Sequence, residues 1–278
     1  VFPHSLLLES SDYSSNNKNF SYICCNPIAS IELKNKKLTT NFPDKSSIIE
    51  EVDESIDIPE RIHEFSTQFK SEKFPFEFIS NGVFGFIAHE AVERFDKIKL
   101  DRNKTGMDIP DMYYAVYKNI IAISLFNHEA YLFSNTYESD HNLDEIENLL
   151  NSQISTPFKF EMVGKKSSNL SDSEFIDFVK KGKEHCYRGD VFQLVLSRQF
   201  SQQFKGDEFN VYRTLRSINP SPYLFFFDYG YFKIFGSSPE AQLIVDNGKA
   251  EIHPIAGTFR RTGNDLKDTK AAKELAKD

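Results

Sequence analysis

Runs of β-branched and aromatic side chains punctuate the first half of the chain. They are bounded by Asn, Pro, Gly and Asp, a pattern typical of strands. The predicted strands are Phe20–Cys25, Ser30–Leu33, Val83–Ala88, Met112–Leu125 and Ala130–Phe133. Apolar residues at helical spacing predict helices over Ile58–Phe69 and about Leu143–Gln153.

The second half begins after the polar stretch Lys165–Asn169, which we interpret as a linker. Ser171 and Glu174 have capping-box spacing and predict the start of a helix that Gly189 ends. A strand is predicted over Val191–Phe200. The sequence therefore predicts two domains, residues 1–165 and 169–278.

Two hairpins are predicted near the end of the chain. The first joins Tyr223–Asp228 to Tyr231–Gly236 and would pair Tyr223 with about Gly236. The second joins Ala241–Val245 to Lys249–Pro254 through Asn247-Gly248, the strongest short hairpin signal. Helices together with consecutive hairpins predict an α+β fold with antiparallel sheets.

The Asn-Gly hairpin brings possible chemistry together. Antiparallel pairing would place Glu240 opposite about Ile255, beside Ala256-Gly257-Thr258 and close to Arg260 and Arg261. A carboxylate, a glycine, a hydroxyl and guanidinium groups could bind a substrate that carries a carboxylate. The alternative is that these residues form an ordinary sheet edge, with a turn glycine and solvated arginines and no binding role.

Gln193 is a polar residue within an otherwise apolar predicted strand. A buried amide needs hydrogen-bond partners, so a purely structural role is an open alternative to a role in a site.

The composition of the chain disfavours several classes of partner and location. The net charge is −8 with no long Lys/Arg run, which disfavours nucleic acid and anionic membrane surfaces as partners. The longest apolar run, near Asn119–Phe126, is too short to span a bilayer. Three cysteines without disulfide or metal-ligand spacing predict a reducing compartment, the cytoplasm. The chain starts at Val1, and both of its ends look cut.

An ordered series of motifs resembles the chorismate-binding enzyme family. The likeness covers nearly the whole chain and includes the Asn-Pro-Ser-Pro-Tyr and Pro-Ile-Ala-Gly-Thr sequences. The motifs are Leu7–Ser10, Asn81–Phe86, Asp108–Asp111, Gly189–Ser197, Asn219–Tyr223, Gly236–Glu240 and Pro254–Thr258. The resemblance implies that antiparallel sheets pack together with helices outside.

This family includes anthranilate, aminodeoxychorismate, isochorismate and salicylate synthases. Isochorismate-type members have a lysine base where this chain has Gln193, and an amide cannot activate water, so ammonia suits the site better. Aminodeoxychorismate synthases often have a nucleophilic lysine where this chain has Ala256. The resemblance thus implies a large subunit of anthranilate synthase. An aminodeoxychorismate synthase and a non-catalytic tryptophan-binding module are the alternatives.

Site residues follow from the same resemblance. Glu240 corresponds to the general acid, while Gly257 and Thr258, with Ala256 beside them, correspond to substrate-binding positions. A feedback site for L-tryptophan is implied, although Pro and Tyr at a strand entry also occur for structural reasons alone. Its residues would be Ser10, Pro222, Tyr223, Leu224 and Lys18.

The resemblance also implies partners and a cofactor. A separate glutamine amidotransferase subunit would supply ammonia, and Mg²⁺ would bind chorismate. Its glutamate ligands are expected beyond Asp278, so the 278 residues alone are expected to lack synthase activity.

Overall fold

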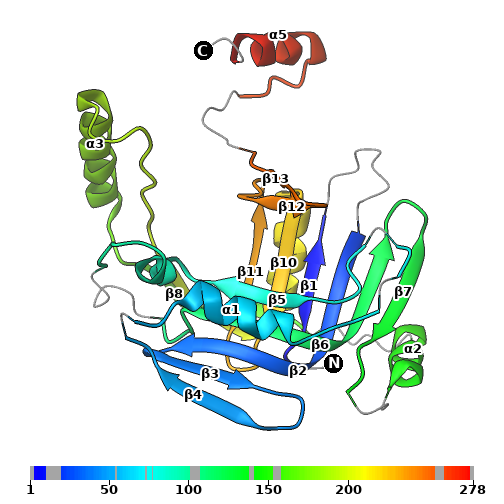
Figure 1. The fold of residues 1–278 in the computed structure, drawn as a ribbon. Coiled ribbons are helices and arrows are strands. Elements are labelled where there is room, and N and C mark those ends of the chain that lie inside the picture. The colour runs from blue at the N-terminus through cyan, green and yellow to red at the C-terminus, as the bar shows by residue number, and fades with distance from the viewer. Residues whose placement is uncertain are drawn as a thin grey trace. The chain divides into compact units, whose positions relative to one another are not determined.

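A computed structural model describes residues 3–10, 20–53, 55–72, 74–76, 78–100, 107–137, 141–152, 158–253 and 260–275. The chain divides into two compact units, Val1–Ser152 with Leu215–Asp278 (unit 1) and Gln153–Thr214 (unit 2). Antiparallel sheets and helices make up both, which confirms the predicted α+β class (Figure 1). The predicted domains 1–165 and 169–278 are not tested by this division and stay a prediction.

Unit 1 is built on one sheet, in which nine strands fall within the described residues. Their bounds are β1 Leu6–Glu9, β2 Phe20–Lys34, β3 Lys37–Asn41, β4 Ser47–Glu51, β5 Val83–Ile87, β6 Met112–Ser124, β7 Glu129–Ser134, β10 Tyr223–Asp228 and β11 Lys233–Ser238. The continuous path is β11-β10-β1-β2-β3-β4, while β6 pairs with β2, β5 and β7.

The long strand β2 pairs with β6 along most of its length and has different partners on its other edge. The first part of β2 pairs with β1, and its last residues pair with β3. Between them, Asn26 has a φ of 60° and the register with β6 shifts between Pro27 and Ala29. Proline is tolerated at such a bulge because it cannot donate to a regular ladder. The two separate strands predicted here are therefore one bulged strand.

Each face of the sheet buries a different set of side chains. Helix α1 (Ile58–Thr67) packs Ile58 and Phe65 against β2, β3 and β6, and helix α2 (Leu143–Asn151) buries Ile146 beside Cys25. Cys24 instead lies in an aromatic cluster with Tyr117 and Tyr229. Adjacent strand residues point to opposite faces, which explains why the two neighbouring thiols belong to different clusters.

One predicted hairpin is confirmed, and the other has a different register from the predicted one. Asn247 and Gly248 both have positive φ, 49° and 76°, so the predicted Asn-Gly turn between β12 (Ile244–Asp246) and β13 (Lys249–Glu251) is confirmed. The predicted register of the preceding hairpin is wrong, because Tyr223 pairs with Ser238 instead of Gly236. Four residues turn the chain there, and Asp228 accepts a hydrogen bond from the Gly230 N–H at 2.7 Å.

Unit 2 contains β8 (Phe160–Ser168), α3 (Asp172–Arg188) and β9 (Phe200–Gly206). The capping box at Ser171 and the left-handed Gly189 at the end of α3 are both confirmed. The linker over Lys165–Asn169 is wrong, because β8 continues to Ser168 and pairs with β9. Helix α4 (Phe209–Ile218) crosses the boundary between the units, and α5 (Asp265–Leu275) is the last described element.

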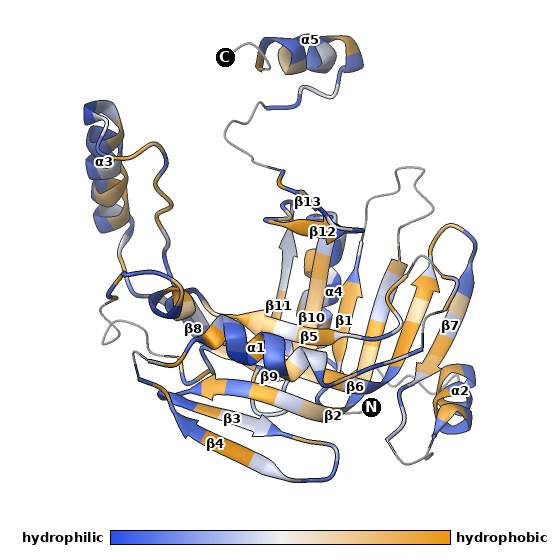
Figure 2. Cartoon of the chain, in the orientation of Figure 1, coloured by the Kyte–Doolittle hydropathy of each residue, from blue (hydrophilic) through white to orange (hydrophobic). Residues whose placement is uncertain are grey.

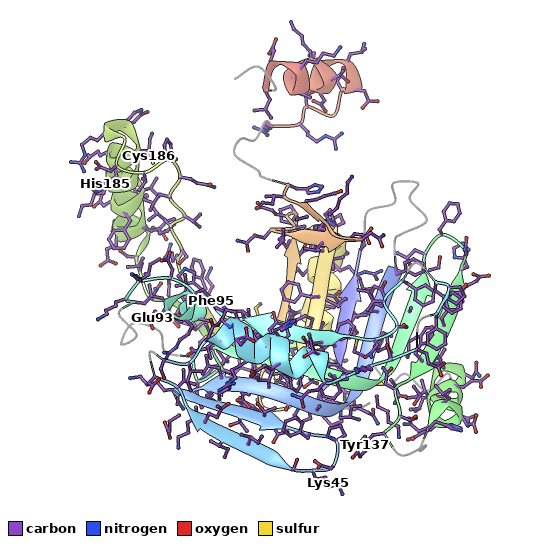
Figure 3. The ribbon with its side chains drawn as sticks, in the orientation of Figure 1. Lys45, Glu93, Phe95, Tyr137, His185 and Cys186 are labelled. Atoms are coloured by element: carbon purple, nitrogen blue, oxygen red, sulfur yellow. The ribbon has the colours of Figure 1, made fainter. Side chains whose placement is uncertain are left out.

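The segment after α3 is not the predicted strand. Residues 191–199 have no ladder partner among the described residues, and Phe192 and Val195 are exposed. A strand needs a neighbouring strand for its backbone groups, so the local preference alone is insufficient. Figure 2 shows the hydrophobic colour of this segment beside α3, and Figure 3 shows His185 and the exposed Cys186 on the helix itself.

Candidate active and regulatory sites

The first candidate site lies at the open end of the Asn-Gly hairpin. The pairs Ile244–Glu251 and Asp246–Lys249 have the register that the sequence predicts for this hairpin, and Glu240 precedes its first strand. Ala256, Gly257 and Thr258 lie outside the described residues, so their part in the site stays a prediction.

Glu240 is held by its backbone and leaves its carboxylate exposed. Its N–H donates to Ser238 Oγ at 3.3 Å, and Ser238 Oγ donates to the Glu240 carbonyl at 3.2 Å. This reciprocal pair anchors the residue to the end of β11. An exposed carboxylate fixed at a strand end is accessible to a bound substrate.

The second candidate site lies where the end of β1 is paired with the start of β10. Glu9 pairs with Leu224, and the same register, continued by one residue, places Ser10 opposite Tyr223. Residues far apart in the sequence, predicted to share one binding site, thus come from adjacent strands. Tyr223 is 41% exposed and so accessible to a ligand.

Hydrogen bonds join the segment before β10 to β11. Ser237 Oγ donates to the Asn219 carbonyl at 2.5 Å and lies 2.9 Å from the hydroxyl of the buried Ser221. Ser221 precedes Pro222, and its Oγ donates to the Tyr223 carbonyl at 3.3 Å. The entry to β10 is therefore held firmly in place.

Leu224 and Glu9 face away from Tyr223. Leu224 is only 1% exposed, and Glu9 pairs with Arg216 at 3.3 Å. Alternation along a strand puts these side chains on the opposite face of the sheet. A ligand beside Tyr223 would therefore meet Leu224 through its backbone.

Two predicted site residues, Gln193 and Lys18, stay predictions. Gln193 is exposed and belongs to unit 2, while Glu240 and Tyr223 belong to unit 1. Lys18 lies outside the described residues.

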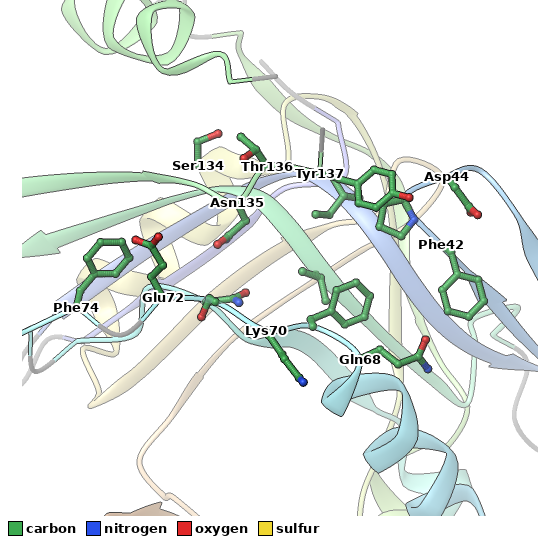
Figure 4. A pocket seen from close by; sticks show the side chains of 16 residues that line it. Phe42, Asp44, Gln68, Lys70, Glu72, Phe74, Ser134, Asn135, Thr136 and Tyr137 are labelled. Atoms are coloured by element: carbon green, nitrogen blue, oxygen red, sulfur yellow. The ribbon is translucent and has the colours of Figure 1, made fainter. Parts of the chain in front are cut away.

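A cavity in unit 1 was missed from the sequence. It measures about 730 Å³ and lies between the end of α1, the β3–β4 turn and the end of β7 (Figure 4). Lys70, Glu72 and Asn135 contribute polar groups to it, and Ile28 and Val116 apolar ones. These residues come from separate loops and strands without a motif, so no local signal could have identified it. None of the predicted site residues lines it.

Burial sets the ionisation of the cluster behind the second site. Desolvation raises the pKa of the Cys24 thiol and of the Tyr117 and Tyr229 phenols, so these groups stay neutral. The Tyr229 hydroxyl is buried and has no hydrogen-bond partner among the described residues. The side chains of this cluster therefore contribute to the core and do not act as an acid or a base near neutral pH.

Neither a metal centre nor a membrane helix is found in the described part of the chain. No group of three or more His, Cys, Asp or Glu side chains there could hold a metal ion. Among the same residues, no helix is long and apolar enough to cross a membrane.

Comparison with known proteins decides the family. A family model described as chorismate binding enzyme matches residues 6–278. The chain belongs to the chorismate-binding enzyme family.

Similar members of the chorismate-binding family share one name. The chain is 28% identical to anthranilate synthase component 1 of Lactococcus lactis over 99% of its own length and 60% of that protein. It is 32% identical to anthranilate synthase component 1 of Aquifex aeolicus, over 71% of the chain and 42% of that protein. The chain thus spans about half the length of these relatives.

A solved structure has the same fold. The crystal structure of anthranilate synthase component I from Streptococcus pneumoniae matches with a TM-score of 0.71 at 24% identity, over 95% of this chain and 58% of that one. At this identity the match shows the fold alone.

Proposed function

We propose that the complete protein is the large subunit of an anthranilate synthase, which converts chorismate and ammonia to anthranilate and pyruvate in the first step of tryptophan biosynthesis. The observation that carries this proposal is the family match along residues 6–278, combined with relatives named anthranilate synthase component 1. A partner glutamine amidotransferase would supply the ammonia. The free thiols fit the cytoplasm as its compartment.

Each residue has a defined task in this reaction. Glu240 donates a proton to the departing ring hydroxyl while ammonia adds to the ring, and its exposed carboxyl group is accessible for that task. Gln193 cannot act as a base for water, which favours ammonia as the nucleophile. Ala256, Gly257 and Thr258 bind the substrate. Pyruvate is then eliminated and the ring becomes aromatic.

Mg²⁺ is the proposed cofactor, and it would neutralise the chorismate carboxylate. The described residues do not supply a set of three carboxylate or imidazole ligands for it. We propose that the complete protein supplies its ligands, as the family resemblance implies.

L-tryptophan is the proposed inhibitor, bound beside Ser10, Pro222 and Tyr223, with Lys18 and the Leu224 backbone. Support comes from the adjacency of β1 and β10. Because Tyr223 pairs with Ser238, which also hydrogen-bonds the Glu240 backbone, a ligand at Tyr223 has a short packed route to the catalytic carboxylate.

The test is product analysis with the complete protein. Chorismate, Mg²⁺ and ammonia should yield fluorescent anthranilate of the correct mass. Aminodeoxychorismate as the product would replace the proposal with the aminodeoxychorismate synthase alternative. Tryptophan binding without any product would support the binding-module alternative.

A substitution then tests the role of Glu240. Glu240→Gln keeps the side-chain shape but cannot donate the proton, so kcat should fall by about 100-fold or more. Glu251→Gln changes an exposed carboxylate on β13 of the same hairpin and should leave kcat within about twofold. Equal activity of the two variants would rule out Glu240 as the acid.

A further inference from the structure

The cavity at the end of α1 has a floor made by the protein core. Val116 of β6 is only 2% exposed and lies in the cluster that α1 covers. Ile28 and Phe69 pack against the same cluster, and the rings of Phe65 and Phe69 lie 5.1 Å apart. The cavity volume of about 730 Å³ is typical of small-molecule sites, which measure about 300–1,000 Å³. The fold therefore provides an apolar base for a ligand.

Asn135 adds a fixed hydrogen-bond acceptor to the cavity wall. Its backbone N–H donates to the Lys118 carbonyl at 2.6 Å, and its Nδ2 donates to the Tyr117 carbonyl at 3.1 Å. These two bonds hold the residue directly after the end of β7. Because the amide nitrogen is engaged, Oδ1 is the group that can accept a hydrogen bond from a ligand (Figure 4).

The charged side chains that line the cavity are Asp44, Lys70 and Glu72. Asp44 belongs to the β3–β4 turn and Glu72 to the segment after α1, so two separate loops bring carboxylates to one cavity (Figure 4). Hydrogen bonds from the Ser46 hydroxyl and N–H, at 2.6 and 2.8 Å, lower the pKa of Asp44 and keep it ionised at neutral pH. Two negative charges beside one positive charge favour a cationic ligand.

Aromatic side chains make up much of the remaining lining. Phe42, Phe69, Phe74 and Tyr137 border the cavity. The face of an aromatic ring attracts a cation, and organic ammonium groups are bound in this way. Apolar surface together with carboxylates suits a molecule that has methylene groups between its positive charges.

We propose that this cavity binds an aliphatic polyamine. The methylene groups lie on the apolar floor, while the ammonium groups pair with Asp44 and Glu72 and donate to Asn135 Oδ1. A bound polyamine joins the β3–β4 turn to the segment after α1 and so stabilises unit 1. Because none of the predicted site residues lines the cavity, this site is independent of the proposed function.

The test is calorimetric titration of the complete protein with spermidine and with putrescine, combined with thermal unfolding. Both should bind with a Kd below about 1 mM, and saturation should raise the Tm because the ligand binds the folded state. Spermidine, which has more ammonium groups, should bind more tightly than putrescine. Butane-1,4-diol has the carbon chain of putrescine without its charges and should not bind. A diol that binds as well as putrescine would disprove recognition of the charges.

Two substitutions test the sign of the charge in the cavity. Glu72→Gln removes one carboxylate, so the Kd for spermidine should rise by about threefold or more, as expected for an exposed ion pair. Lys70→Met removes the opposing positive charge but keeps an apolar stem, so the Kd should fall by about twofold or more. Both side chains are exposed, so the Tm without ligand should stay within a few degrees.

Glu147→Gln is the matched control, because Glu147 is an exposed carboxylate on α2 that does not line the cavity. This variant should bind spermidine like the unchanged protein. Equal weakening in Glu72→Gln and Glu147→Gln would overturn the site, since attraction to the net negative charge of the chain would then explain the binding. Weaker binding by Lys70→Met would exclude a cationic ligand, and no binding of either polyamine to the unchanged protein would refute the proposal.

Discussion

Leu33 of β2 and Leu194 of the segment after α3 are the same residue type in very different surroundings. Leu33 is 0% exposed and lies in a strand paired on both edges, with α1 packed in the same cluster. Leu194 is 45% exposed and belongs to no described ladder. Apolar sequence by itself therefore does not make a core, because burial also needs neighbours that satisfy the backbone.

The same contrast extends over the two units. Among the described residues, the three buried clusters all belong to unit 1, whereas unit 2 exposes apolar side chains on α3 and on the segment that follows it. Unit 1 should thus provide most of the cooperative stability, and three measurements can test this difference.

The largest effect is expected for Leu33→Ala. Truncating this fully buried side chain leaves a cavity and should lower the free energy of unfolding by about 2–5 kcal/mol in urea titrations. Leu194→Ala, the matched control in unit 2, should change it by less than about 0.5 kcal/mol. Similar losses in both would show that unit 2 has a core after all.

Alkaline pH should weaken unit 1 next. Burial raises the pKa of Cys25 from 9.0 to about 11, and that of Cys24 in the same direction. A raised folded-state pKa gives stability that is fully present below pH 9 and is lost as the pH rises through 9 to 11. Urea midpoints measured across this window should fall.

Substitutions of the cysteines can show which thiol causes the fall of the urea midpoint with rising pH. Cys25→Ala should reduce it, whereas Cys186→Ala removes an exposed thiol of unit 2 and should leave it as in the unchanged protein. An unaltered slope in Cys25→Ala would exclude this thiol as a source.

The smallest effect is expected at the start of α3. Ser171→Ala removes the side chain that accepts the Glu174 N–H and should destabilise the helix by about 1 kcal/mol. Faster amide hydrogen exchange confined to the first turn would report it. Lys181→Ala, in the exposed middle of α3, should not accelerate exchange there.

Local signals predicted the elements whose causes are local. Strand β6, the Ser171 capping box and the Asn247-Gly248 turn each depend on residues close in sequence, and each was found with nearly the expected bounds. Strand β1, by contrast, has four residues and exists because β2 and β10 flank it, so no strand was predicted there.

The site was predictable in part for the same reason. Resemblance placed Ser10 and Tyr223 in one site, and the register of β1 with β10 shows how they come together. A turn at Tyr229-Gly230 predicts the wrong partner for Tyr223, because the Tyr229 N–H donates to the Phe232 carbonyl and the turn lies at Gly230-Tyr231. Tyr229 is also buried in the aromatic cluster, a contact that the turn residues alone do not reveal.

Strand β1 lies between β2 and β10, and its two partners are synthesised at very different times. Glu9 leaves the ribosome about 215 residues before its partner Leu224. At 5–20 residues per second, one edge of the nascent β1 remains uncovered for roughly 10–40 seconds. An open strand edge can pair with other chains, so the β1 segment is exposed to such pairing until β10 has been synthesised.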